Sequence, residues 1–305
     1  MKHILSGRQF TTTELGAVFE RADYMRGQSQ DIGQRRKLMG RQAGRIMTAL
    51  FYEPSTRTRL SFVSAAKRLG MHVIETENAA EFSSAAKGET IEDSTRVVAG
   101  YSDVIVMRHR QNGAAERAAA VSKVPVINAG DGTGEHPTQA LLDLYTIQDK
   151  KDRLDGLHVV VGGDLKHGRT ARSLTQLLAL YPDNHFSFVS TADLGMGEDV
   201  KEYLSANGST FTETDAINGP LRTADVVYWT RMQTERLTAG EEAHTSLDFI
   251  LGQRALEAMR QDAIIMHPLP RVGEIDPIVD DDPRAAYFEQ AQNGLYVRMA
   301  LLDMV

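Results

Sequence analysis

Apolar runs alternate with amphipathic stretches along most of the chain, which predicts strands alternating with helices. An apolar run at 46–52 indicates a buried strand. Apolar residues at helical spacing follow it from Leu60 to Leu69, where Gly70 ends the pattern. The same reasoning predicts these further elements before residue 130: helices at 11–27, 89–101 and 113–121, and strands at 71–75, 103–108 and 125–128. Such alternation is typical of a parallel sheet with helices on both faces.

A second alternating set begins near residue 157. Its predicted elements are strands at 157–163, 186–190, 225–230 and 263–267, and a helix at 169–181. Pro137 begins a strong helix between the two sets, and a last helix at 285–302 is expected to pack back on the first. We therefore expect an α/β fold of two similar-sized domains, each a parallel sheet flanked by helices. The predicted boundaries are 1–135 plus 288–305, then 150–287, with 136–149 as the connecting helix.

Composition narrows the class of protein. The 305 residues are 42% hydrophobic and 25% charged, which is ordinary for a globular protein. No apolar run approaches the roughly 18 residues of a membrane span, and the first residues lack the apolar core of a signal peptide. The net charge of −7 argues against general nucleic-acid binding. The absence of cysteine excludes disulfides and thiolate catalysis in this chain, and it fits a cytoplasmic protein.

Because the whole chain is acidic, anionic ligands need a local basic pocket. Ser55, Thr56, Arg57 and Thr58 stand where the first strand gives way to a helix. The first N–H groups of a helix lack partners, and the helix dipole is positive there, so this stretch suits a phosphate or another small dianion. The alternative is a well-capped helix, with Ser55 as the N-cap and solvated arginines.

Ser-Thr-Arg-Thr-Arg at 55–59 resembles the carbamoyl-phosphate signature of the transcarbamoylases. Further motifs of that family follow in its order: the loop 83–90, Arg108 at a strand end, His-Pro-Thr-Gln at 136–139, the loop 162–170, Arg-Met-Gln at 231–233 and His-Pro-Leu-Pro-Arg at 267–271. Each motif alone is weak, but together they are specific. The chain is identified from them as a member of the transcarbamoylase family, with a resemblance that runs from about residue 46 to the end.

The resemblance implies roles for residues of the first domain. One set would hold the phosphate of carbamoyl phosphate: Ser55, Thr56, Arg57 and Thr58, with Ser83 and Lys87 from a neighbouring subunit. Another set would polarise the carbonyl oxygen: Thr58, Arg108 and His136. Gln139 would fix the carbamoyl amide. The expected catalytic residues are Arg57, Thr58, Lys87, Arg108 and His136. Ala86 departs from members specific for aspartate, which often carry a lysine there.

Roles in the second domain also come from the resemblance. Arg169 would hold the α-carboxylate of an amino acid, and Arg231 with Gln233 would hold its side-chain carboxylate. Backbone carbonyls at 268–269 would accept N–H groups of the substrates, which makes Leu269 and Pro270 binding residues, and a cis Leu269–Pro270 bond is expected. The alternatives are purely structural: an N-cap role for His136 and surface ion pairs for the arginines.

The implied reaction moves a carbamoyl group from carbamoyl phosphate to the α-amine of L-aspartate, an early step of pyrimidine synthesis, without a cofactor or a metal. His-Pro-Leu-Pro at 267–270 favours aspartate as the acceptor, because the ornithine enzymes typically have His-Cys-Leu-Pro. The resemblance also implies a homotrimer with shared active sites, and it leaves open whether regulatory chains bind.

Three alternatives stay open at the level of sequence. One is a transcarbamoylase for another amine, such as ornithine, N-acetylornithine or succinylornithine. Another is a non-catalytic chain that binds a phosphate-bearing metabolite. A nicotinamide enzyme is the third and least favoured, because the sequence around Gly162-Gly163 does not match the Gly-x-Gly-x-x-Gly fingerprint of dinucleotide-binding proteins.

Overall fold

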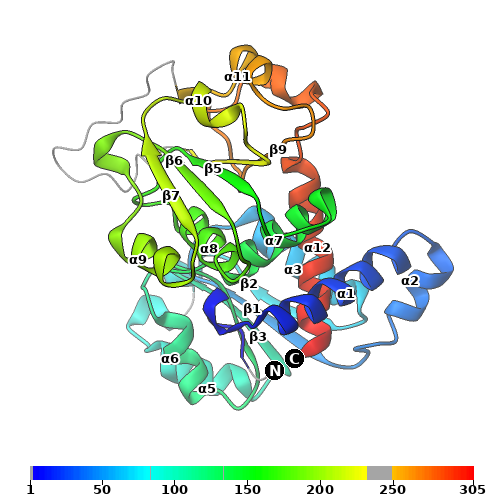
Figure 1. Cartoon of the computed structure of the whole chain (residues 1–305). Helices are drawn as coiled ribbons and strands as arrows, with labels where there is room; N and C mark the ends of the chain where they lie inside the picture. The colour runs from blue at the N-terminus through cyan, green and yellow to red at the C-terminus, as the bar shows by residue number, and fades with distance from the viewer. Residues whose placement is uncertain (1–2, 83, 133, 232–248) are drawn as a thin grey trace. The chain divides into compact units, whose positions relative to one another are not determined.

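The structure is a computed structural model of the chain, and it describes residues 3–82, 84–132, 134–231 and 249–305. The chain divides into two compact units (Figure 1). Unit 1 comprises Met1–Leu141 and Gln292–Val305, and unit 2 comprises Leu142–Ala291. Each unit holds one parallel sheet flanked by helices, as the alternation of elements predicted.

Unit 1 is built on a four-stranded parallel sheet with the order β2-β1-β3-β4. Its strands are β1 (Ile46–Phe51), β2 (His72–Thr76), β3 (Val104–His109) and β4 (Val126–Asp131). All four were predicted within a few residues of their observed ends. Phe51 at the end of β1 pairs with Arg108 in β3, so the segments that follow these strands leave the sheet side by side.

The helices of unit 1 follow the sequence closely where local signals are strong. They are α1 (Thr12–Gln28), α2 (Ile32–Leu38), α3 (Thr56–Arg68), α4 (Ala79–Phe82), α5 (Ile91–Ala99) and α6 (Ala114–Val121), with the first part of α7 (Pro137–Lys151) and the end of α12 (Tyr287–Met304). Helix α1 begins with a full capping box between Thr11 and Glu14. Short helices α2 and α4 were not predicted, because neither presents a long apolar face.

One face of the unit 1 sheet packs against α5 and α6. Leu50, Ile105 and Met107 from the strands lie against Ile91 of α5 and Ala118 of α6 in one buried cluster. Consecutive strand residues point to opposite faces, so Phe51 is buried on the other face. The sheet is therefore covered on both sides, and its polar chemistry is left to the strand ends.

Unit 2 is built on a five-stranded parallel sheet with the order β7-β6-β5-β8-β9. Its strands are β5 (His158–Gly162), β6 (His185–Val189), β7 (Thr210–Thr214), β8 (Val226–Trp229) and β9 (Ile264–Met266). Strand β7 was not predicted. It is an edge strand with mostly exposed side chains, so it lacks the apolar pattern by which the other four strands were found.

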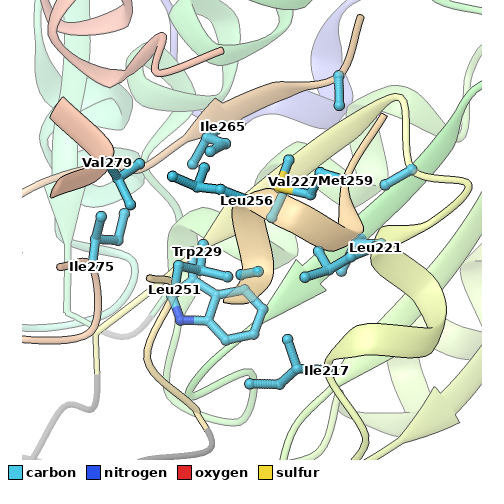
Figure 2. Packing of buried hydrophobic residues seen from close by; sticks show 14 of the residues in the cluster. Ile217, Leu221, Val227, Trp229, Leu251, Leu256, Met259, Ile265, Ile275 and Val279 are labelled. Carbon is cyan, nitrogen blue, oxygen red and sulfur yellow. The ribbon is translucent and has the colours of Figure 1, made fainter. Parts of the chain in front are cut away.

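The remaining helices of unit 2 are α8 (Arg169–Leu178), α9 (Glu198–Ala206), α10 (Asn218–Leu221) and α11 (Gln253–Ala258). Of these only α8 was predicted, and it ends three residues earlier than expected. A buried cluster joins strands β8 and β9 to α11 and the segments around it (Figure 2). Trp229 lies in this cluster next to Leu251, and its indole N–H donates to the carbonyl of Phe249 at 3.1 Å. The chain's one tryptophan is therefore a core residue of unit 2.

Within the described ranges, no helix is both long enough and apolar enough to cross a membrane.

Candidate active site

The predicted anion site at 55–58 lies at the start of α3, directly after β1. Ser55 occupies the N-cap position in an extended conformation, yet among the described residues its side chain accepts no capping hydrogen bond. Thr58 is buried, one turn into the helix, and its hydroxyl lies 3.4 Å from Nε2 of His136. The Ser55 hydroxyl is thus not needed to complete the helix end, which favours the anion interpretation over the capped-helix alternative.

The two arginines of this motif have different surroundings in the structure. Arg59 is held by two carboxylates, at 2.7 Å from Glu75 and 2.6 Å from Glu77. Arg57 makes no ion pair within the described part of the chain. Partial burial, and then the nearby positive charge of Arg108, lower the pKa of the Arg57 guanidinium. Two cations placed together in this way attract an anion.

Arg108 itself is oriented by a residue that sequence reasoning missed. Its Nε lies 3.1 Å from a carboxylate oxygen of Glu53, and both side chains are mostly buried. Glu53 lies two residues past the end of β1, and Arg108 lies in the adjacent strand β3, where it pairs with Phe51. A charged residue just past a buried strand was the available signal, but only the pairing of β1 with β3 identifies its partner.

His136 precedes the first residue of α7, so it occupies the N-cap position, as the purely structural interpretation of this residue proposed. Its carbonyl accepts the N–H groups of Gln139 and Ala140 at 2.9 and 3.1 Å. Its ring is buried, with Nε2 near Thr58 as above and Nδ1 at 3.5 Å from the Thr138 hydroxyl. The backbone thus serves the helix, while the ring lies between two hydroxyls.

The loop before α7 is held by two carboxylates. Asp131 accepts the N–H groups of Gly113 and Glu135, both at 2.9 Å. Glu135 accepts the hydroxyl of Ser6 at 2.7 Å and the N–H of Gly7 at 2.8 Å. These contacts hold the backbone on which the His136 ring depends.

Strands β1, β3 and β4 are neighbours in the sheet, so their carboxyl ends share one edge. This edge carries the α3 start, Arg108 and the loop to His136, and ligands of such sheets bind beyond the carboxyl ends of the strands. Lys87 is exposed and is the last residue of the 3-10 turn Ser84–Lys87. Ser83 lies outside the described residues.

In unit 2, the glycines at 162–163 have a packing role. A Cβ on Gly162 would lie 2.0 Å from the Trp229 ring. A Cβ on Gly163, where φ is +106°, would lie 2.1 Å from the Thr230 carbonyl. Close approach of β5 to β8 therefore accounts for both glycines without a dinucleotide.

Arg169 and Arg231 follow neighbouring strands of unit 2. Arg169 is the buried first residue of α8, which succeeds β5, and Arg231 follows β8 by two positions. Because Gly162 at the end of β5 pairs with Trp229 at the end of β8, the two guanidinium-bearing segments leave the same edge of the sheet. Gln233 lies outside the described residues.

The His-Pro-Leu-Pro-Arg segment follows β9, the neighbour of β8. The Leu269–Pro270 peptide bond is cis, as predicted, and Leu269 has a left-handed backbone with φ of +54°. The three polar segments of unit 2 thus gather at the carboxyl edge of its sheet. Over the described ranges, no group of three or more histidine and acidic side chains is arranged to hold a metal ion.

Both units are α/β structures that present cationic side chains at the carboxyl ends of a parallel sheet, and they define a two-domain α/β protein for anionic ligands. The family model for the carbamoyl-P binding domain of aspartate/ornithine carbamoyltransferase matches residues 2–149. The model for the Asp/Orn binding domain of the same family matches residues 155–305. The chain belongs to the aspartate/ornithine carbamoyltransferase family.

Individual relatives agree with this assignment. The chloroplastic aspartate carbamoyltransferase of Arabidopsis thaliana is 51% identical over 100% of this chain and 78% of its own length. The aspartate carbamoyltransferase catalytic subunit of Vibrio campbellii is 44% identical over 100% of this chain and 96% of its own. A crystal structure of the Trypanosoma cruzi aspartate transcarbamoylase with carbamoyl phosphate and aspartate has a TM-score of 0.89 and 37% identity, covering 100% of this chain and 96% of that one.

Proposed function

We propose that this chain is a catalytic chain of aspartate carbamoyltransferase. It transfers the carbamoyl group of carbamoyl phosphate to the α-amine of L-aspartate, which gives N-carbamoyl-L-aspartate and phosphate in pyrimidine biosynthesis. The observation that carries the choice of acceptor is the pair Arg169 and Arg231 at one edge of the unit 2 sheet. A dicarboxylate matches two guanidinium groups, whereas the second amine of ornithine would be repelled by one of them.

Unit 1 supplies the groups for carbamoyl phosphate. The residues proposed to hold its phosphate are Ser55, Thr56, Arg57 and Thr58, joined by Ser83 and Lys87 of a neighbouring subunit. The proximity of Arg57 and Arg108 supports a dianion at this place, because a bound phosphate relieves the repulsion between the two cations. Arg108 contacts both the phosphate and the carbonyl oxygen in this proposal.

The chemical step needs no nucleophilic side chain. The lone pair of the aspartate amine attacks the carbonyl carbon, and the carbonyl oxygen becomes an oxyanion. Donors from Thr58, Arg108 and His136 stabilise that charge, and Gln139 orients the carbamoyl amide. The bond from carbon to the phosphate oxygen then breaks, and the departing phosphate accepts the amine proton.

Unit 2 orients the acceptor. Arg169 holds the α-carboxylate, and Arg231 with Gln233 holds the side-chain carboxylate. The backbone carbonyls of Pro268 and Leu269 accept N–H groups of the substrates. Fixing both carboxylates aims the amine at the carbonyl carbon, which is the positional contribution to the rate.

The larger organisation is proposed on the same basis. The carbamoyl-phosphate domain comprises 1–135 and 288–305, the aspartate domain comprises 150–287, and 136–149 connects them. The assembly is a homotrimer with active sites shared between subunits. Binding of regulatory chains to this assembly is compatible with the proposal. A cysteine-free sequence fits the cytoplasm, although several relatives are named chloroplastic.

An amine panel tests the function. Purified protein is incubated with carbamoyl phosphate and one of L-aspartate, L-ornithine, N-acetylornithine or no amine, and both phosphate and carbamoylated product are measured. We expect product with L-aspartate alone. Product with ornithine would overturn the roles of Arg231 and Gln233, and binding of carbamoyl phosphate without any product would favour the non-catalytic alternative.

A further inference from the structure

The segment that follows β9 is closed by a buried side-chain contact that the proposed mechanism does not use. The ring of His267 is 1% exposed, and its Nε2 lies 2.7 Å from Oε1 of Glu274. The other ring nitrogen, Nδ1, accepts the backbone N–H of Leu269 at 2.8 Å. Because Nδ1 accepts, the ring proton stands on Nε2 and is donated to the Glu274 carboxylate.

Glu274 fixes the far end of the same segment. Its second carboxylate oxygen accepts the backbone N–H of Val272 at 2.8 Å, and its own carbonyl accepts the N–H of Leu251 at 3.0 Å. Burial raises the pKa of the Glu274 carboxyl. The hydrogen bonds from His267 and the Val272 backbone outweigh burial, so the net pKa is below its ordinary value. The carboxylate is therefore ionised and accepts on both oxygens.

The start of the segment is anchored as well. The backbone N–H of His267 donates to the Oε1 atom of Gln290 at 2.9 Å, so the residue is fixed through both its backbone and its ring. Between the anchors, Leu269 has φ of +54°, a left-handed conformation that L residues rarely adopt. Its N–H bond to the His267 ring supports that conformation directly.

We propose that His267 and Glu274 are positioning residues for the acceptor, which act by holding the backbone carbonyls of Pro268 and Leu269 at fixed positions. The inference rests on the proposed function, in which those carbonyls accept N–H groups of the substrates. Neither side chain needs to touch a substrate. The neutral ring sets the Leu269 amide plane, and the carboxylate keeps the ring from turning.

Two substitutions test the contributions of His267 and Glu274 separately. His267→Asn keeps an acceptor near the position of Nδ1 but loses the contact with Glu274. Glu274→Gln keeps the size of the side chain but leaves only one acceptor oxygen for two donors. Glu213→Gln is the matched control, because Glu213 lies on β7, at the opposite edge of the same sheet, where it pairs with Lys201.

We expect both substitutions to lower kcat/KM for L-aspartate by roughly 10- to 100-fold, mainly through KM. The Kd for inorganic phosphate, a probe of unit 1, should stay within about twofold. The double variant should be little worse than either single variant, because the two residues act as one unit. The Glu213→Gln control should match the wild type in all three measurements.

Three results would overturn the inference. They are unchanged aspartate kinetics in both variants, equal losses of aspartate and phosphate binding, and fully additive effects in the double variant. The phosphate Kd also shows that unit 1 of a variant is folded, and His267→Gln provides a second variant if His267→Asn does not fold. Failure of the proposed function is distinguishable, because the wild type would then form no product with aspartate in the amine panel.

Discussion

At the scale of single residues, the structure distinguishes side chains that the sequence presents as equivalents. Arg57 and Arg59 belong to one motif, but Arg59 is neutralised by Glu75 and Glu77, whereas Arg57 lies close to the cation Arg108. The ion pairs of Arg59 maintain local structure. Arg108 contacts Glu53, but the nearby charge of Arg57 still favours binding of an anion here. The difference arises from which strand end lies nearby, and that depends on sheet order.

Replacing Arg108 with alanine should lower turnover by on the order of 10²–10³, because the substitution removes a donor to the oxyanion. Initial rates with saturating carbamoyl phosphate and aspartate measure this effect. Arg110→Ala is the matched control, since Arg110 is an exposed residue just past the same strand. Near-normal turnover in Arg108→Ala would remove that residue from the proposed mechanism.

At the scale of elements, two helix starts with similar sequences do different things. Thr11 and Glu14 exchange hydrogen bonds in a capping box at the start of α1, with Thr11 N–H to Glu14 at 2.8 Å and Glu14 N–H to Thr11 at 3.3 Å. Ser55 occupies the same position at the start of α3, but within the described structure it makes no such bond. The Thr11 hydroxyl stabilises its helix, whereas the Ser55 hydroxyl makes no cap bond and is proposed to bind the phosphate.

Thr11→Ala should therefore lower the free energy of unfolding by about 1 kcal/mol without changing phosphate affinity. Ser55→Ala should cost less stability and should weaken the binding of inorganic phosphate. Urea unfolding and calorimetric titration of the two variants make the comparison. An equal loss of stability in both, with phosphate affinity unchanged, would return Ser55 to the role of an ordinary N-cap.

The end of α12 is tied to other parts of unit 1 through a buried carboxylate. Asp303 lies 2.6 Å from Arg21 of α1 and accepts hydrogen bonds from Arg41 and Gln42. Burial raises the pKa of this carboxyl, but the bonds from Arg41 and Gln42 and the charges of both arginines outweigh burial and lower it below its ordinary value of 3.8.

Asp303→Asn should lower the free energy of unfolding by about 2 kcal/mol at neutral pH, since the lost bonds involve a charged group. Because the folded pKa is depressed, the contribution is complete well above pH 3.8 and is lost as pH falls from there through the folded pKa. The difference between wild type and variant should therefore shrink in acid. Urea unfolding at several pH values measures it, with the exposed Asp23→Asn as a control.

At the scale of the whole molecule, a chain with a net charge of −7 carries Arg108, Arg169 and Arg231, which are proposed to bind the substrates, at or just past the strand ends of two sheets. Local fields there, and not the field of the whole protein, must capture two anionic substrates. The proposed site also takes Ser83 and Lys87 from a neighbouring subunit. That sharing makes activity a property of the assembly.

Mixing inactive Arg57→Ala chains with inactive Lys87→Ala chains should restore activity in a shared site. In random trimers from an equal mixture, up to about a quarter of the sites combine an intact Arg57 with an intact Lys87 from the neighbour. Activity after dissociation and reassembly measures the recovery. The chain carrying both substitutions, mixed with either single variant, should recover nothing, and no recovery in verified mixed trimers would indicate a self-contained site.

The parts of the fold that could be predicted from sequence are those that local physics specifies. Apolar runs identified β1, β3 and β8, and the capping box at Thr11 identified the start of α1. The polar edge strand β7 and the short helices α10 and α11 were missed, since an element without a continuous apolar pattern carries little local signal. The family motifs could be recognised in the sequence because each is a short continuous stretch that lies at a strand end.

By itself, the sequence determined the alternation of strands and helices, the family motifs and the residue types available for anionic substrates. These follow from periodicity and from side-chain chemistry, which act over a few residues. Only the tertiary structure decided the strand orders, the pairing of Glu53 with Arg108, the contact of Gly162 with Trp229 and the tautomer of His267. Such features require groups distant in sequence, or backbone and side chain in a folded loop, to meet at hydrogen-bonding or van der Waals distance, and sheet topology determines which groups do.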